Sequence, residues 1–229
     1  DPPRARINVN VTTFGELKIA KMDNEGNYVP DTSFNLSSNS DMSQIIGTYT
    51  TGSDGTVTIP NLLPETYYIQ EVKVPSGLAI DSTIHSIKVE SDKTATFTKV
   101  NQIGKGSVYA KKEDAETGEK PQGQATFENA VYALAVREDI IHPVTKRVIL
   151  SAGTVIAEHK ADKSGNIPAW TNLYPGVYEI YEVKQPNGYN LDNTRYEVII
   201  DSGNQASVTV SRTLKDTVIK GSVKVWKKD

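Results

Sequence analysis

The feature that most constrains this chain is a sequence pattern that occurs twice and begins a third time. The segment GSVYAKKED at 106–114 recurs as GSVKVWKKD at 221–229 and, more loosely, as GELKIAKMD at 15–23. A second pair, YYIQEVKVPSG at 67–77 and VYEIYEVKQPNG at 177–188, shares its spacing of apolar, acidic and turn residues. Such self-similarity indicates tandem copies of one structural unit.

The repeat also predicts the domain boundaries. We expect two complete units at 15–103 and 104–220. Residues 1–14 are then a trailing strand or linker of a preceding unit, and 221–229 are the leading strand of a following unit or a final strand. Because the 229 residues include neither an initiating Met nor a signal peptide, we expect a section of a longer protein.

Within each repeat the hydrophobic period is two, which is typical of strands. In ELKIAKM, Leu17, Ile19 and Lys21 fall on one face, and in TYYIQEV, Ile69 and Glu71 share a face. Short alternating segments separated by Asp-Gly, Asn-Gly and Ser-Gly turns predict an all-β chain of two tandem Ig-like β-sandwiches.

Two segments of the second repeat need a separate interpretation. FENAVYALAVRED at 127–139 has helix propensity, but its register against SFNLSS in the first repeat favours a strand. The second repeat is longer because of an insertion at 137–153, which is richer in apolar residues than a bare loop. We expect this insertion to pack as an extra hairpin on its own sandwich.

Composition excludes several classes of protein. Hydrophobic residues make up 37% of the chain, which is enough to fold. No stretch approaches the roughly 18 apolar residues of a membrane span, and a net charge of −3 provides no attraction to nucleic acid. The absence of cysteine excludes disulfides and thiol chemistry. The histidines, His85, His142 and His159, lack metal-ligand spacing and are expected at the surface, so we expect no metal and no cofactor.

Three kinds of polar residue recur at positions where the alternation predicts buried apolar side chains. They are the lysines Lys21, Lys112 and Lys227, the glutamates Glu71 and Glu182, and the strand-ending residues Asn101 and Asp216. A single such set is explained by a buried salt bridge or by side chains that turn to solvent. Their recurrence in the same register favours a function, because a buried charge is costly. Lys111 and Lys228 are the alternatives if the register is shifted by one.

These residue types can form a covalent bond with one another. A lysine in an apolar core loses its charge and becomes a nucleophilic amine, while a buried glutamic acid stays protonated. The acid can hydrogen-bond the side-chain carbonyl of Asn101 and later pass a proton to the leaving group. Attack on Asn101 expels ammonia and attack on Asp216 expels water. Either product is an intramolecular isopeptide bond, formed once and without turnover, so the chain is not a conventional enzyme.

The segments LKIAKMD and YYIQEVKVPSG, the terminal Asn101, and YEIYEVKQPNGY at 178–189 resemble CnaB-type (SpaA-like, prealbumin-like) isopeptide-forming domains of Gram-positive adhesins and pilins. The last segment matches the E-box of that family, whose Glu is catalytic. Repeat one departs from the pattern at Leu78, where the E-box prefers Tyr, and at Glu65, where repeat two has Gly176. The resemblance implies crosslinks Lys21–Asn101 and Lys112–Asp216, with catalytic Glu71 and Glu182.

The resemblance also implies a role and a location. It implies a rigid stalk in a cell-wall-attached, extracellular surface protein of a Gram-positive bacterium. The partners expected for this chain are neighbouring domains of the same protein, and the fragment is expected to be a monomer. The alternative is an adhesin module that binds a host extracellular-matrix protein through a sheet edge or the insertion at 137–153.

Overall fold

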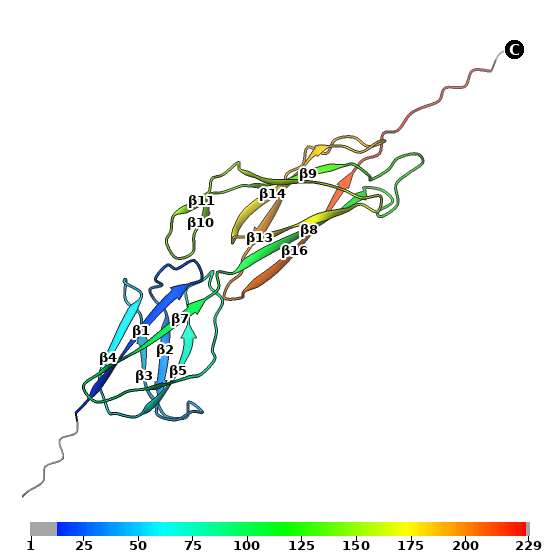
Figure 1. Cartoon of the computed structure of the whole chain (residues 1–229). Coiled ribbons are helices and arrows are strands. Elements are labelled where there is room, and N and C mark those ends of the chain that lie inside the picture. Colours follow the sequence, from blue (N-terminus) through cyan, green and yellow to red (C-terminus); the bar gives the residue numbers. More distant parts are fainter. Residues whose placement is uncertain (1–12, 228–229) are drawn as a thin grey trace, which may run out of the picture. The chain divides into compact units, whose positions relative to one another are not determined.

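The computed structural model describes residues 13–227, and within that range it contains strands and turns but no helix. The chain divides into two compact units between Ile103 and Gly104. We call them domain 1 and domain 2, and each is built of β-sheets (Figure 1). The predicted all-β class with two domains in tandem is confirmed.

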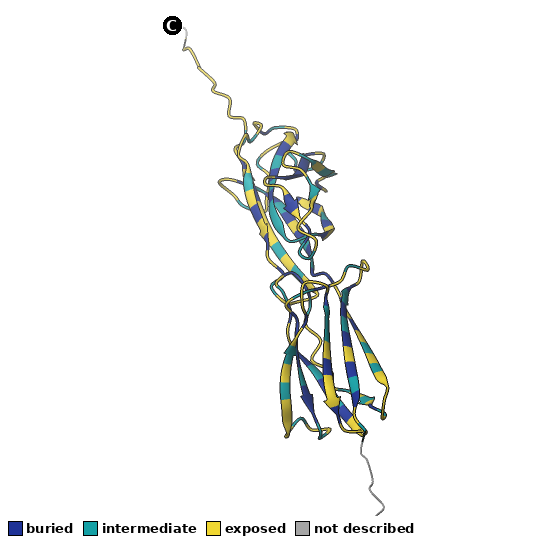
Figure 2. Cartoon of the chain, turned by 90° about the vertical axis from the view of Figure 1, so that its left-hand side faces the viewer, coloured by how far each residue is buried: buried dark blue, intermediate teal, exposed yellow. Residues whose placement is uncertain are grey.

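Domain 1 is a sandwich of two sheets with strand orders β4-β1-β7 and β3-β2-β5-β6. Apolar side chains of both sheets form one core. Buried and exposed residues alternate along the strands, as the colours of Figure 2 show, so the predicted period of two is confirmed. The strands are β1 (Gly15–Asp23), β2 (Ser33–Ser37), β3 (Ile45–Thr50), β4 (Thr56–Leu62), β5 (Thr66–Lys73), β6 (His85–Lys88) and β7 (Thr94–Asn101).

The first and last strands of domain 1 lie side by side and parallel. Their register sets Lys21 beside Lys99 and Asp23 beside Asn101. Since parallel strands run in the same direction, the carboxyl ends of β1 and β7 meet at one end of the sheet. The inward-facing Lys21 and the terminal Asn101 are therefore brought to the same end of the sandwich.

Domain 2 repeats this architecture with sheets ordered β13-β8-β16 and β12-β9-β14-β15. Its first and last strands, β8 and β16, are again parallel neighbours. The strands are β8 (Lys105–Asp114), β9 (Val131–Val136), β10 (Ile140–Ile141), β11 (Val148–Leu150), β12 (Val155–Lys160), β13 (Asn166–Leu173), β14 (Gly176–Lys184), β15 (Tyr196–Ile200) and β16 (Ser207–Asp216).

The insertion of domain 2 forms the short β10–β11 hairpin, as expected. Ile140 is fully buried in the domain core, and Ile149 and Leu150 pack against that core while partly exposed. A side chain at Gly176 would overlap Ile140, because a Cβ there would lie 2.3 Å from its Cδ1. Glycine in place of the Glu65 of domain 1 therefore makes room for the insertion, which explains this departure between the repeats.

The segment with helix propensity is a strand over 131–136, so the strand interpretation is confirmed. The expectation that all three histidines lie at the surface is wrong for His142, which is 6% exposed. Its Nδ1 accepts hydrogen bonds from the backbone N–H groups of Val144 and Thr145. The imidazole thus closes the turn between β10 and β11, a role that residue spacing alone does not reveal.

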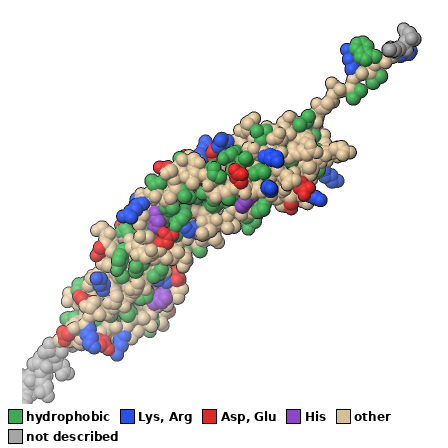
Figure 3. Space-filling model, turned by 45° about the horizontal axis from the view of Figure 1, so that its top comes forward, with side chains coloured by type: hydrophobic (Ala, Val, Ile, Leu, Met, Phe, Trp, Pro, Cys, Tyr) green, Lys and Arg blue, Asp and Glu red, His purple; other side chains and the backbone are tan. Residues whose placement is uncertain are grey.

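Basic and acidic side chains are interspersed over the face seen in Figure 3. After β16, residues 219–227 form no strand, and Val223 and Val225 are exposed. Lys227 lies in this exposed segment, whereas Lys228 lies outside the described residues, as do positions 1–12.

Candidate functional site

Domain 1 buries the three residues singled out from its sequence. Lys21, Glu71 and Asn101 are 0%, 1% and 2% exposed. They lie on β1, β5 and β7, so the cluster draws on both sheets of the sandwich. Polar groups in such a core are tolerated only when they are paired or uncharged. The contacts of each of the three side chains therefore indicate how its burial is compensated.

Glu71 lies between Asn101 and the loop that contains Asp81. Its Oε2 accepts a hydrogen bond of 2.5 Å from Asn101 Nδ2 and one of 3.0 Å from the backbone N–H of Asp81. The expected contact of Glu71 with the carbonyl of Asn101 is therefore wrong, because the amide turns its nitrogen toward the glutamate. Among the described residues, Asn101 Oδ1 has no hydrogen-bond partner.

The Lys21 amine is held in an environment that disfavours its charge. Its Nζ donates a hydrogen bond of 2.7 Å to the carbonyl of Met22. Burial lowers the pKa of Lys21 to about 8, while the nearby Glu71 and Asp23 raise it and Lys99 lowers it further. A larger fraction of this lysine is therefore a neutral amine near neutral pH than of a lysine in water.

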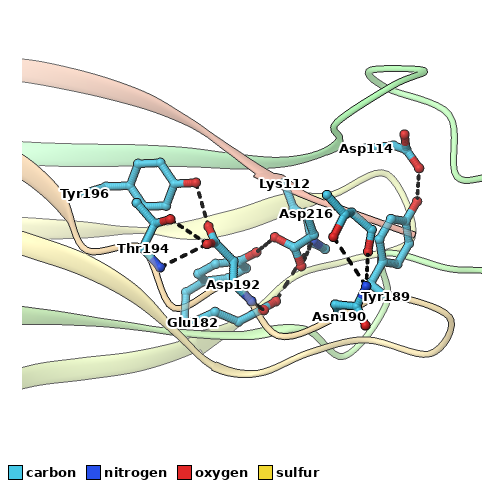
Figure 4. A network of polar contacts seen from close by, with 11 residues as sticks. Lys112, Asp114, Glu182, Tyr189, Asn190, Asp192, Thr194, Tyr196 and Asp216 are labelled. Atoms are coloured by element: carbon cyan, nitrogen blue, oxygen red, sulfur yellow. Dashed lines mark hydrogen bonds and ion pairs between the residues drawn. The ribbon is translucent and has the colours of Figure 1, made fainter. Parts of the chain in front are cut away.

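Domain 2 brings its three residues into closer contact (Figure 4). The side chains of Lys112, Glu182 and Asp216 are inaccessible to solvent or nearly so. Lys112 Nζ contacts Asp216 Oδ2 directly and lies 4.0 Å from Glu182 Oε1. The amine and the carboxyl group that it would attack are thus already adjacent, with the glutamate beside them.

Aromatic rings surround the Lys112 amine. Its Nζ lies 4.8 Å from the centroid of the Tyr189 ring and 5.9 Å from that of Phe127. The Tyr189 hydroxyl donates a hydrogen bond of 2.9 Å to Asp114, which lies two residues beyond the lysine on β8. Tyr189 therefore ties the E-box turn to the first strand, a contact that the leucine at 78 in domain 1 cannot make.

Glu182 is set up to carry a proton. Burial raises its pKa to about 7, the hydrogen bond from the Asp192 backbone N–H opposes this rise, and the neighbouring Asp216 adds to it. A carboxyl group with a pKa near neutrality can both give and take a proton at physiological pH.

Comparison with known proteins places both repeats in one family. The sequence matches the family model of the SpaA prealbumin-like fold domain over residues 15–103 and again over 106–214. The chain belongs to the SpaA prealbumin-like domain family. No curated protein matches it.

Solved structures with the same fold include two that cover most of this chain. The Bacillus anthracis TIE protein matches with a TM-score of 0.71 and 21% identity, over 90% of this chain and 34% of that chain. A C-terminal fragment of the pilus adhesin SpaC from Lactobacillus rhamnosus GG matches with a TM-score of 0.52 and 15% identity, over 93% and 100%. At these identities the likeness establishes the fold, and this chain spans about a third of the TIE chain.

The neighbouring lysine of the second SpaA domain lies on the other face of β8. Lys111 is partly exposed and forms an ion pair with Glu119. Lys112 is the inward residue, in agreement with the alternation read from the sequence.

One residue of the second SpaA site escaped the sequence analysis. Tyr132, on β9, is fully buried and donates a hydrogen bond of 3.3 Å to Asp216 Oδ1. It pairs with Glu182 across the sheet, as Phe34 pairs with Glu71 in domain 1. Aligning SFNLSS (33–38) with VYALAV (131–136) places Phe34 opposite Tyr132 and shows that this hydroxyl is present in only one repeat.

The described residues include no group of three or more His, Asp or Glu side chains arranged to hold a metal ion. Within the same range, no helix is long and apolar enough to cross a membrane.

Proposed function

We propose that each SpaA domain of this chain closes an intramolecular isopeptide bond, Lys21–Asn101 in domain 1 and Lys112–Asp216 in domain 2. The observation that carries this proposal is the direct contact between a solvent-inaccessible lysine amine and a buried carboxyl group beside Glu182. A permanently buried ion pair gains little net stability. Conversion to a neutral amide removes both charges from the core.

In domain 2 the reaction is the condensation of an amine with an acid. A proton passes from the Lys112 ammonium to the Asp216 carboxylate, which gives a neutral amine and a carboxylic acid. The nitrogen attacks Cγ, the C–N bond forms, and one C–O bond breaks. The leaving oxygen departs as water with the acid proton and a proton from Nζ, relayed by Glu182. The fixed contact supplies the proximity that drives this unimolecular step.

In domain 1 the leaving group is ammonia. The neutral Lys21 amine attacks Cγ of Asn101, and the nitrogen Nδ2 leaves with a proton that Glu71 relays from Nζ. The 2.5 Å hydrogen bond between Nδ2 and Glu71 lies along this path. Glu71 and Glu182 act as proton carriers that are restored at the end, and no external reactant is needed.

We further propose that the chain is a stalk section of a Gram-positive pilin or adhesin, exported and attached to the cell wall. Shared fold with a fragment of the pilus adhesin SpaC supports this role. Each bond would join the first strand to the last, so that tension passes between them through an amide. Without it, each domain could extend by several hundred ångströms, at roughly 3.4 Å per residue. By analogy with a disulfide, closure contributes about 4–5 kcal/mol to stability.

The intact mass of the purified chain tests the bonds. Closure of both predicts a loss of about 35 Da, of which about 17 is ammonia and about 18 is water. Lys21→Met should retain only the loss of water, and Lys112→Met only that of ammonia. Lys111→Met is the matched control, because Lys111 lies on the outer face. Peptide mapping then locates each linked pair, and an unchanged mass in the wild-type chain contradicts the proposal.

A further inference from the structure

The two SpaA sites differ at the residue that faces the catalytic glutamate from the neighbouring strand. Phe34 pairs with Glu71 in domain 1, and Tyr132 pairs with Glu182 in domain 2. Both rings are buried, with exposed fractions of 1% and 0%. The phenolic hydroxyl is therefore the added group, and it accompanies the change of acyl residue from Asn101 to Asp216.

The Tyr132 hydroxyl is directed at the reacting carboxyl group. It donates a hydrogen bond of 3.3 Å to Oδ1 of Asp216, while the other oxygen, Oδ2, contacts the Lys112 amine. Burial and the negative charges of Asp216 and Glu182 raise the pKa of Tyr132, so it remains a neutral donor at physiological pH. The two oxygens of one carboxyl group are thus distinguished by their partners.

We propose that Tyr132 is a catalytic residue of domain 2, and that a tyrosine at this position selects aspartate as the acyl residue whereas phenylalanine selects asparagine. This inference rests on the isopeptide function proposed above. Tyr132 holds Oδ1, the oxygen that carries negative charge in the tetrahedral intermediate and remains as the amide carbonyl. Oδ2 is then the oxygen that leaves as water, with one proton from the acid and one from Lys112 Nζ through Glu182.

The hydroxyl is needed in domain 2 for two reasons. A donor aimed at a developing oxyanion stabilises the transition state, and a long hydrogen bond in the resting site can shorten as that charge develops. A buried carboxyl oxygen without a donor is also costly before any reaction takes place.

Domain 1 lacks this donor: its acyl residue is a neutral amide, and among the described residues Asn101 Oδ1 has no hydrogen-bond partner. Asn101 already directs its leaving nitrogen at Glu71. Phe34 fills the corresponding position with a purely apolar ring.

The first experiment is Tyr132→Phe in the full chain, with closure of both domains followed by peptide mapping over time. We expect the Lys21–Asn101 link to form as in the wild type and the Lys112–Asp216 link to form at least about tenfold more slowly. Tyr132→Phe combined with Asp216→Asn should close again, now with loss of ammonia, because the phenylalanine–asparagine pair of domain 1 has been rebuilt. Closure of Tyr132→Phe at the wild-type rate overturns the inference.

A second experiment introduces the tyrosine–aspartate pair into domain 1. Its result does not depend on whether the Tyr132 variant folds. Asn101→Asp in domain 1 should close poorly, whereas Asn101→Asp with Phe34→Tyr should close with a loss of about 18 Da. Phe34→Tyr alone is the control for the added hydroxyl. Near-ultraviolet circular dichroism reports whether each variant is folded. Equal closure of Asn101→Asp with and without the tyrosine overturns the selection rule.

The outcomes separate this inference from the function on which it rests. A wild-type chain with neither link refutes the proposed isopeptide function itself. A wild-type chain with both links, whose closure is insensitive to Tyr132, leaves that function standing and removes only the role of the tyrosine.

Discussion

Domains 1 and 2 use the same sandwich but surround the same lysine and glutamate with different neighbours. Domain 1 has the neutral acyl residue Asn101 and a second lysine, Lys99, two residues before it on β7. Domain 2 has the acidic Asp216, preceded at the same distance by Leu214. The parallel register of the first and last strands thus brings the lysine and the strand-ending residue to the same end of each sandwich, while the residue two positions before the strand end differs between the domains.

The loop after the E-box also differs between the domains. Asp81 in domain 1 and Asp192 in domain 2 each donate a backbone hydrogen bond to the buried glutamate of their own domain. The side chain of Asp81 pairs with Lys99 at 2.6 Å, whereas that of Asp192 accepts a hydrogen bond of 2.6 Å from the Tyr196 hydroxyl. A charged contact in one domain is replaced by a neutral donor in the other, and the position of the glutamate is retained.

The largest expected effect comes from removing the proton carriers one at a time. Glu71→Gln should abolish closure of domain 1 and leave domain 2 closed, and Glu182→Gln should do the reverse. Glutamine keeps the size and hydrogen-bonding capacity of the side chain but cannot relay a proton. Each open domain should lose about 4–5 kcal/mol of stability. Intact mass and thermal unfolding measure both effects, and a glutamine variant that still closes its own domain would show that the glutamate is dispensable.

A second prediction is that closure of the two domains responds to pH in opposite directions. Domain 1 needs neutral Lys21, whose pKa is about 8, so its rate should rise about tenfold per pH unit well below 8. Domain 2 transfers the Lys112 proton internally but needs protonated Glu182, whose pKa is about 7. Its rate should therefore fall about tenfold per unit well above 7.

Freshly translated chain, moved into buffers of graded pH and mapped over time, gives both profiles in one sample. The two links serve as internal controls for each other, because folding and handling are shared. Parallel profiles for the two domains would contradict the assignment of different limiting groups.

The smallest expected effect concerns Lys99. Replacing it with leucine, as at 214, removes a like charge that lowers the pKa of Lys21. The Lys21 pKa should rise, the neutral fraction should fall, and closure of domain 1 at neutral pH should slow by about two- to fivefold. Lys88→Leu is the matched control, since Lys88 lies on the exposed surface. If Lys99→Leu closes domain 1 at the same rate as Lys88→Leu, the charge of Lys99 has no effect on closure.

Alternation and repetition were sufficient to predict which polar residues lie inside. Lys21 and Lys112 follow two inward apolar residues on strands of period two, so their burial follows from the pleat. The repeat then located Glu182 and Asp216 from Glu71 and Asn101. Burial by alternation and equivalence between repeats both depend only on where a residue lies along its strand, which can be read directly from the sequence.

The parts of the site that the sequence does not predict depend on contacts between strands. The donor role of Tyr132 requires knowing that β9 faces Glu182 and that the ring reaches Asp216. Buried His142 closes a turn inside an insertion that has no counterpart in repeat one, so no alignment could flag it. The orientation of the Asn101 amide depends on its contact with Glu71, which residue identity alone does not specify.

The parallel pairing of the first and last strands has a further consequence for the covalent connectivity of the chain. With Lys21 linked to Asn101, the strands β2 to β6 become part of a closed ring, and the shortest bonded route through domain 1 runs along β1 and out at the end of β7. A single peptide cut anywhere in the ring would open it without separating the two ends of the polymer. In a chain with the proposed link, this ring could therefore vary in length and sequence, or be cut once, while the covalent path that connects one domain to the next would stay intact.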